Sequence, residues 1–354
     1  MITLLNVIPS PPNSELVLGP LHFRYYGLCI ALGVLVAVSI GRRRFAALGG
    51  DPEDITTIAI AAVPAGLIGA RLYHVITDWS RLYSGGRWWP DAFAIWNGGL
   101  GIPGGVLAGT AVGVYACKRM RLDWRYVADC AAPAIPVAQA IGRFGNWFNQ
   151  ELYGRPTDLP WALRIDAPEG YPPGTTFHPT FLYEGLWNLA LAGLIILGGR
   201  KFVLRPGRWM ALYVAGYGLG RLWVESLRID VATEFFGLRV NTWISLIAIA
   251  GGLLWFFWRG NPIDRAATAE LRAGGDPRAG VGRRGGTLAD LDGVTDEDLH
   301  AAASEIDQDP THAHRSGEHV AAPDDVAAPD DMAAADGMAA TDQMAAPDDQ
   351  GDPA

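Results

Sequence analysis

Seven long apolar stretches constrain this chain more than any other feature of its sequence. Each approaches the length of about 20 residues that a helix needs to cross the hydrocarbon core of a bilayer. A backbone in lipid has to satisfy its own hydrogen bonds, so we expect these stretches to be helices. A soluble alternative would need seven buried helices of this length in one core. The stretches are residues 25–41, 55–76, 95–117, 126–145, 181–199, 209–227 and 240–258.

Charge is divided unevenly along the 354 residues. Residues 259–354 contain 7 Lys or Arg and 21 Asp or Glu, whereas residues 1–258 contain 21 and 16. The first part has no basic stripe, which excludes a nucleic-acid-binding protein. The second part is rich in Ala, Asp and Pro and has no Trp, Tyr or Phe, so we expect disorder there. We therefore predict an N-terminal segment 1–20, an all-α transmembrane domain 21–258 and an acidic tail 259–354.

The cysteines and histidines give no sign of a metal or a disulfide framework. Cys29, Cys117 and Cys130 are far apart in apolar surroundings, where a lone cysteine behaves as a small hydrophobic residue. No Cys/His spacing indicates zinc. Solvated side chains are the favoured interpretation of the tail histidines. These are His300, His312, His314 and His319. We predict neither a metal nor a cofactor.

Basic residues predict the orientation in the membrane. Clusters of Lys and Arg follow the first, third, fifth and seventh stretches, at 42–44, 118–125, 200–208 and 259–265. Alternating helices place all four clusters on one side, which the excess of positive charge assigns to the cytoplasm. The N-terminus is then external and the C-terminus cytoplasmic. The two longest connections, around 77–94 and 146–180, form a small external head. Its tryptophans suit either an interfacial belt or a cap over a site.

Charged side chains at membrane depth are costly, so we expect the chemistry where they gather. The segment GRFGNWFNQELYGR, residues 142–155, follows an apolar stretch and contains Arg143, Asn146 and Glu151. Its Gly154 would allow a backbone to approach a ligand closely. An interfacial loop with a snorkelling arginine is the alternative. Two asparagines and a glutamate beside the arginine favour a polar pocket.

The sixth stretch carries a polar face of its own. Its polar residues are spaced i, i+4, i+8 and i+11, which places them on one side of a helix. They are Tyr217, Arg221, Glu225 and Arg228. A structural ion pair between Arg221 and Glu225 is the alternative. It is compatible with function, because a carboxylate can hold a guanidinium in position for an anion.

Further polar groups fall at the same, external, ends of the helices. In HPTFLYEG, residues 178–185, Thr180 is the expected N-cap of a helix. Anchoring by Tyr183 and capping by Glu184 is the alternative to direct chemistry there. Several arginines at this depth predict an anionic lipid headgroup, since guanidinium binds phosphate through two hydrogen bonds. The accessory polar residues are Tyr26, Arg71, His74, His178 and Tyr183.

Six motifs resemble those of the prolipoprotein diacylglyceryl transferase family. Their order and spacing agree with the family from about residue 20 to residue 258, and the GRxGNxxNxExxGR pattern is highly specific. The tail lies outside the resemblance. The motifs are RYYGL (24–28), GARLYHV (69–75), WNGGLGIPGG (96–105), GRFGNWFNQELYGR (142–155), HPTFLYEG (178–185) and YGLGRLWVESLR (217–228).

The resemblance implies a seven-helix enzyme with a small external head in the bacterial plasma membrane. Such enzymes transfer the diacylglyceryl group of phosphatidylglycerol to the lipobox cysteine of a prolipoprotein signal peptide. They form a thioether and release glycerol phosphate, which is the first step of lipoprotein maturation. The predicted partners are therefore membrane lipid and a lipobox peptide.

The resemblance also assigns residues. Arg143 corresponds to the arginine that binds the phosphatidylglycerol headgroup, and Arg221 to the second essential arginine. We accordingly expect Arg143, Arg221 and Tyr26 to be catalytic. The expected lipid-binding residues are Arg143, Asn146, Glu151, Gly154, Tyr217 and Glu225. Arg71, His74, His178 and Tyr183 are accessory candidates.

One position departs from the family pattern. Some family members have a histidine in the Gly-rich segment of the third helix, where this chain has Pro103. This argues against a histidine base at that position, and Pro103 predicts a broken or kinked helix. We hypothesise that the positive potential of the arginines promotes loss of the substrate thiol proton. His74 and His178 are the competing candidates for a base.

Two other functions have to be weighed. A transporter or flippase for an anionic lipid would also place Arg and Glu within the membrane. Against it, the halves of the chain show no internal repeat, and the polar groups cluster on one side of the membrane. A seven-helix signalling receptor with an acidic tail rests on the helix count alone.

Overall fold

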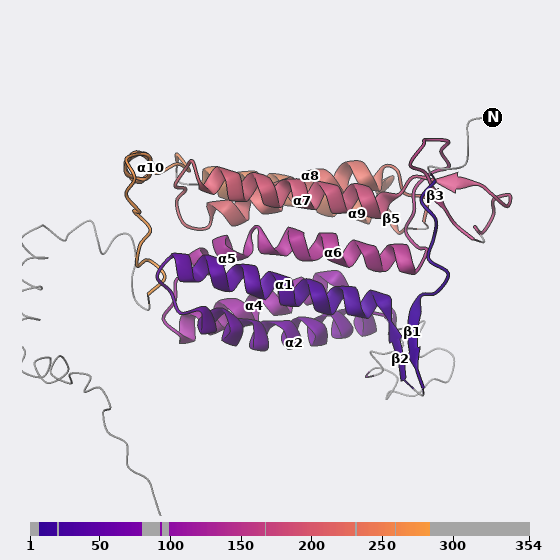
Figure 1. Ribbon diagram of the computed structural model, residues 1–354, viewed down its shortest axis with the longest axis horizontal. Helices are drawn as coiled ribbons and strands as arrows, with labels where there is room; N and C mark the ends of the chain where they lie inside the picture. Colours follow the sequence, from indigo (N-terminus) through magenta and orange to yellow (C-terminus); the bar gives the residue numbers. More distant parts are fainter. Residues whose placement is uncertain are drawn as a thin grey trace, which may run out of the picture. The chain divides into compact units, whose positions relative to one another are not determined.

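The computed structural model describes residues 7–19, 21–79, 93, 99–166, 168–230, 232–258 and 260–283. These residues are mostly helical, with three short two-stranded hairpins (Figure 1). Most of the predicted 77–94 connection and the tail from residue 284 onward lie outside the described residues.

Every predicted apolar stretch overlaps at least one helix. The fourth stretch is divided into two helices, because Pro133 lies between them and proline lacks the N–H needed to continue a helix. The elements are α1 (Tyr25–Ala47), α2 (Pro52–Thr77), α4 (Ile102–Arg119), α5 (Trp124–Ala131), α6 (Ala134–Phe148), α7 (Thr180–Gly199), α8 (Arg208–Glu225) and α9 (Val240–Phe257).

Four of the described helices are long and apolar enough to cross a membrane, namely α1, α2, α7 and α9. Helix α8 carries three charged side chains, Arg208, Arg221 and Glu225, within its 18 residues. Large apolar side chains such as Ile60 and Leu107 are exposed on the helix surfaces. Contiguous exposure of this kind is costly in water and favourable in lipid. The fold is therefore that of a helical membrane protein.

The hairpins are short and all antiparallel. β1 (Glu15–Leu18) pairs with β2 (Leu21–Arg24), which leads directly into α1. β5 (Glu234–Phe235) pairs with β6 (Leu238–Arg239), which leads into α9. β3 (Leu163–Arg164) pairs with β4 (Thr176–Phe177) in the connection between α6 and α7. Leu163, Phe177 and Phe181 share a buried cluster, so this connection packs against the first turn of α7.

Neighbouring helices pack in a connected series. α2 lies against α4, α1 against α2 and α6, α6 against α7, and α7 and α9 against α8 (Figure 1). The α2–α4 contact depends on glycine. A Cβ on Gly104 would lie 2.3 Å from the carbonyl oxygen of Gly69, and one on Gly69 would lie 2.5 Å from the carbonyl oxygen of Gly104. The two backbones can approach this closely only because neither residue has a side chain.

The described structure extends past the predicted tail boundary at residue 259. Helix α10 (Arg265–Arg272) is preceded by its N-cap Asp264, whose side chain accepts a hydrogen bond from the Ala267 N–H. Thr268 is buried and donates to the Val203 carbonyl. Gly282 N–H donates to the Leu48 carbonyl at 2.8 Å. Residues 260–283 are therefore folded against the helices, contrary to the expectation of disorder from residue 259.

Candidate functional site

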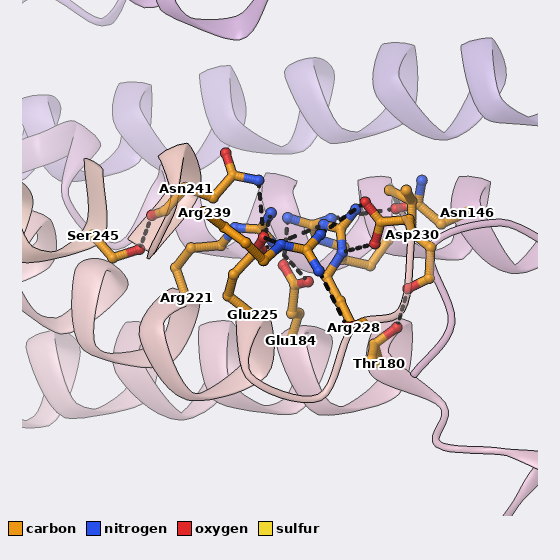
Figure 2. Close-up of polar contacts among 12 residues, drawn as sticks. Asn146, Thr180, Glu184, Arg221, Glu225, Arg228, Asp230, Arg239, Asn241 and Ser245 are labelled. Atoms are coloured by element: carbon orange, nitrogen blue, oxygen red, sulfur yellow. Dashed lines mark hydrogen bonds and ion pairs between the residues drawn. The ribbon is translucent and has the colours of Figure 1, made fainter. Parts of the chain in front are cut away.

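One buried carboxylate is shared by two arginines from different helices. Glu184 on α7 has a side chain that is 6% exposed. Its Oε1 lies 3.1 Å from Nη1 of Arg221 on α8, and its Oε2 forms an ion pair with Nη2 of Arg143 on α6. Figure 2 shows Glu184 and Arg221 within a dense group of polar side chains. Three helices thus meet at a single carboxylate.

A second carboxylate continues this group. Glu225 is one helical turn after Arg221, and its side chain is 1% exposed. Its Oε2 lies 2.8 Å from Nη2 of Arg221, and its Oε1 lies 2.7 Å from Nε of Arg239. Asn241 Nδ2 donates to the same Oε1 at 3.1 Å. Arg221 is therefore held between two carboxylates, Glu184 and Glu225 (Figure 2).

Asp230 closes the group at the end of α8. Its two oxygens accept from Arg228 Nε at 2.6 Å and from Arg239 Nη2 at 3.1 Å. Burial alone would raise the pKa of Asp230, but the hydrogen bond from Arg228 and the charges of both arginines outweigh it and lower that pKa. The carboxylate stays ionised and keeps Arg228 and Arg239 in place. We name Arg143, Glu184, Arg221, Glu225, Arg228, Asp230 and Arg239 the arginine–carboxylate cluster.

The arginines of this cluster keep unused donors. A guanidinium has five N–H groups, and the ion pairs of Arg221 occupy Nη1 and Nη2 with one carboxylate each. The cluster contains four arginines and three carboxylates, so it has a net positive charge. In surroundings shielded from water, such a charge attracts an anion strongly. The arrangement is suited to bind a phosphate.

The segment after α6 joins Arg143 to the predicted polar pocket. Arg143 Nη1 donates to Asn146 Oδ1 at 3.4 Å, and Asn146 Nδ2 donates to Glu151 Oε1 at 2.9 Å. Asn149 Nδ2 donates to the same Glu151 oxygen at 3.2 Å. The structure thus connects three of the residues predicted from sequence in one chain of hydrogen bonds.

Tyr26 lies beside this chain. A Cβ built on Gly145 would lie 2.6 Å from Cδ2 of the Tyr26 ring, so the ring packs directly on the backbone between Arg143 and Asn146. The Tyr26 side chain is 38% exposed. It is therefore open to a molecule that approaches from outside the helices.

Gly154 occurs where two segments come into close contact. A Cβ there would lie 2.8 Å from Cβ of His178 and 3.1 Å from the Leu227 carbonyl oxygen. Gly154 N–H donates to the His178 carbonyl at 3.0 Å, and Arg155 N–H to the Leu227 carbonyl at 2.8 Å. Gly154 therefore joins the α6–α7 connection to the end of α8. This positioning differs from the direct approach to a ligand that the sequence suggests.

His178 and Tyr183 form a separate polar pair. His178 Nδ1 lies 3.1 Å from the Tyr183 hydroxyl, which accepts a hydrogen bond from Trp161 Nε1 at 3.0 Å. Burial, aided by the charge of Arg155, lowers the pKa of His178. Thr180 is not the N-cap expected from sequence. It is the first residue of α7, after Pro179, and its hydroxyl donates to the Leu152 carbonyl.

Arg71 and His74 contact the turn before α4. Arg71 Nη1 donates to the Gly99 carbonyl at 3.0 Å, and His74 Nδ1 lies 2.9 Å from Asp78 Oδ2. Pro103 lies in the first turn of α4, where a missing N–H has no helical partner to lose. The described helix begins at Ile102, directly after the extended residue Gly101, so Pro103 lies at its start and does not kink it.

Tyr217 lines a small cleft between α7 and α8. A Cβ on Gly220 would lie 2.2 Å from the Trp187 ring, so this ring packs directly against the α8 backbone and forms one wall. The lining residues are Glu184, Trp187, Asn188, Tyr217, Gly220 and Arg221. The cleft thus opens onto the arginine–carboxylate cluster.

Sequence reasoning missed several members of the cluster. The sequence leaves Glu184 between helix capping and direct chemistry, and it assigns no role to Asp230 and Arg239 of the cluster or to Asn241 beside it. An acid within an apolar helix is the signal that could have identified Glu184. Asp230 carries no such signal because it lies between α8 and α9, and Asn241 is an uncharged residue in the first turn of α9. Among the described residues, no group of three or more His, Cys, Asp and Glu could hold a metal ion.

These features define a helical membrane protein with a buried arginine–carboxylate site. Comparison with protein families identifies the family to which the chain belongs. The model of the prolipoprotein diacylglyceryl transferase family matches residues 14–258, and the chain belongs to this family.

Individual relatives are similar over about 70% of the chain. A phosphatidylglycerol–prolipoprotein diacylglyceryl transferase of Streptomyces griseus is 51% identical over 243 residues, which cover 69% of this chain and 74% of the relative. One of Corynebacterium glutamicum strain R is 48% identical over 270 residues, covering 72% and 84%. The family match, residues 14–258, spans every residue of the arginine–carboxylate cluster.

Proposed function

We propose that this protein transfers the diacylglyceryl group of phosphatidylglycerol to the lipobox cysteine of a prolipoprotein. The family relationship and the names of the relatives support this activity. The observation that carries it is the pair of arginines, Arg143 and Arg221, held on two helices by one buried carboxylate, Glu184.

Arg143 and Arg221 bind the phosphate of the lipid. Their guanidinium groups offer planar pairs of N–H donors that match phosphate oxygens. Negative charge grows on the phosphate as the leaving group departs, and donors fixed in advance stabilise that charge without reorganisation. Glu184 and Glu225 hold these donors in place, since each carboxylate contacts Arg221 on one side.

The remaining predicted residues shape the site around the phosphate. Asn146 and Glu151 orient Arg143 through their hydrogen-bonded chain. Tyr26 lies at the exposed margin of the site, where lipid or peptide enters. Tyr217 lines the cleft one helical turn before Arg221 on α8. Gly154 packs the connection between α6 and α7 against the end of α8.

The reaction proceeds by displacement at carbon. The peptide thiolate attacks the carbon of the diacylglyceryl group that is bonded to a phosphate oxygen. A C–S bond forms, the C–O bond breaks, and the electron pair stays on oxygen, so glycerol phosphate leaves. The thiol proton ends on the leaving phosphate. The two arginines promote both events, because a positive potential lowers the pKa of a nearby thiol and stabilises the departing anion.

The chain spans the bacterial plasma membrane seven times, with α5 and α6 together forming one crossing. The positive-inside rule supports an external N-terminus, an external head and a cytoplasmic acidic tail. Cysteine substitutions provide the test. Labels added outside intact cells are expected to react at Gly85→Cys and Pro172→Cys but not at Arg121→Cys. Equal labelling of all three would contradict this topology.

A single assay tests the activity. Purified protein is incubated with phosphatidylglycerol and a lipobox peptide, and the peptide is analysed by mass spectrometry. We expect the peptide to gain one diacylglyceryl group. A peptide of unchanged mass, with lipid movement across liposomes that contain the protein, would instead support a transporter or flippase.

A further inference from the structure

Asn188 has a buried amide nitrogen without a hydrogen-bond partner among the described residues. It lies on α7, is 2% exposed, and its Nδ2 has no hydrogen-bond partner among the residues that the structure describes. Buried amide groups in proteins are nearly always hydrogen-bonded, because an unpaired one loses its interaction with water and gains nothing. A ligand group that accepts a hydrogen bond would remove this cost.

Asn188 belongs to the cleft between α7 and α8. The cleft is also lined by Glu184 and Arg221, whose side chains form an ion pair at the end of the cleft that meets the arginine–carboxylate cluster. Trp187 closes one side, and its Nε1 donates to the Gly216 carbonyl at 2.9 Å. Trp187 is fixed in this way and bounds a space of about 10 Å³ beside Asn188, which is room for a single ligand oxygen rather than for a whole lipid chain.

The spacing along the two helices sets the depth of Asn188. Asn188 follows Glu184 by four residues on α7, and Tyr217 precedes Arg221 by four residues on α8. Contacts of Glu184 with Arg221 and of Trp187 with Gly216 show that the helices run antiparallel here. Asn188 and Tyr217 therefore lie on one level, roughly 6 Å along the helix axes from the level of Glu184 and Arg221.

A glycerophospholipid has its acceptors at a matching spacing. Its phosphate is separated from the ester groups only by the glycerol carbons, and each ester offers a neutral carbonyl oxygen. With the phosphate at Arg143 and Arg221, an ester group extends towards the level of Asn188. An amide N–H suits a neutral carbonyl, whereas a further cation at this depth would compete for the phosphate.

We propose that Asn188 Nδ2 donates a hydrogen bond to an ester carbonyl oxygen of the bound diacylglyceryl group. This inference rests on the proposed function and adds a specificity-determining residue to it. It predicts that the enzyme distinguishes ester-linked lipids from ether-linked lipids, which have the same headgroup and chains but no carbonyl.

The test compares two lipids and three proteins. Diester and diether phosphatidylglycerol of equal chain length are presented in mixed micelles to the wild type, Asn188→Leu and Ser245→Ala. Ser245 is the control, because it is buried on α9 and its hydroxyl bonds to the Asn241 carbonyl of its own helix. Transfer to a lipobox peptide gives kcat/KM. Lipid-induced thermal stabilisation of the same preparations gives binding without turnover.

The wild type and Ser245→Ala are expected to prefer the diester lipid by roughly three- to tenfold, the effect of one neutral hydrogen bond. Asn188→Leu is expected to treat both lipids alike, at the diether level. Asn188→Ala removes the amide donor, so it too is expected to lose the preference, and it replaces the Leu variant if that one does not fold.

Two results would overturn the inference: equal use of both lipids by the wild type, or an unchanged diester preference in Asn188→Leu and Asn188→Ala. Failure of the proposed function would look different. The wild type would then leave the peptide unmodified with either lipid, while the stabilisation measurement would still report whether the carbonyl is recognised.

Discussion

Two groups of helices, α2 with α4 and α6 with α7 and α8, are packed by different kinds of contact. The α2–α4 contact is made by backbones that approach at Gly69 and Gly104. The contact of α6, α7 and α8 is made by the arginine–carboxylate cluster, in which Glu184 joins Arg143 and Arg221. Both groups are packed closely, but only the second places several charges at the same depth.

The difference indicates what the charges are for. Small residues alone are sufficient to pack helices in lipid, as α2 and α4 demonstrate. Buried ion pairs give little net stability, because desolvation of both partners offsets most of their attraction. The cluster is therefore poorly explained as a means of joining helices. The desolvation cost of the cluster is explained if its carboxylates keep the arginines in place for an anionic ligand.

The largest expected effect is on the arginines themselves. Arg143→Ala and Arg221→Ala are each expected to lower kcat by about 100- to 1,000-fold, as the loss of a charge-stabilising donor does in other enzymes. Arg143→Lys keeps the charge but loses the planar fork, so a severe loss is expected there too. Peptide modification is measured on protein recovered from membranes. A near-normal rate for Arg143→Ala would contradict the headgroup assignment.

The next effect is on the shared carboxylate. Glu184→Gln removes the charge that holds both arginines, and misplaced donors are expected to lower kcat/KM by about ten- to 100-fold. The control is Glu53→Gln, which breaks the exposed pair between Glu53 at the start of α2 and Arg42 in the last part of α1. Exposed pairs contribute about 0–1 kcal/mol, so little change is expected. Equal effects of the two substitutions on kcat/KM would show that Glu184 matters no more for activity than an exposed ion pair does.

The sequence predicts the helices better than their contacts. Length and apolarity locate each stretch, and the polar motif 142–155 identifies Arg143, Asn146 and Glu151 because an apolar helix precedes it. The position of Glu184 in an apolar helix marks it as unusual, but the sequence does not show that two arginines share it. Which arginines it meets depends on the helix faces that pack together, and one helix does not encode that.

A smaller effect is expected from the glycine contact. Gly104→Ala places a Cβ 2.3 Å from the Gly69 carbonyl oxygen. Overpacking of this kind destabilises by about 1–3 kcal/mol, which thermal unfolding in detergent would detect. Gly193→Ala on α7 is the control, because its Cβ meets nothing within 4 Å. Activity per folded molecule is expected to change less than stability does. If Gly104→Ala abolishes turnover without destabilising the protein, the α2–α4 group also serves catalysis.

The histidines are expected to matter little. His74 is paired with Asp78, and His178 has a lowered pKa, so it loses its proton below the pH at which an ordinary histidine does. Between pH 6 and 9 the rate should follow the peptide thiol, whose usual pKa is about 8.5, and rise with pH. His74→Gln, His178→Gln and the double variant are expected to keep this profile. Loss of turnover at every pH with lipid binding retained would establish a histidine base.

The smallest effect is expected from the acidic tail. The family match ends at residue 258, and every member of the arginine–carboxylate cluster precedes that point. Truncation after Arg283 is therefore expected to leave both activity and melting temperature unchanged. Truncation after Asn261 also removes α10, and with it the contacts of Thr268 with Val203 and of Gly282 with Leu48. This shorter protein is expected to keep its activity but to unfold at a lower temperature, because these contacts join α10 and its flanking segment to the helices. If the truncation after Arg283 loses turnover while correctly inserted, the acidic tail acts on the transfer reaction itself.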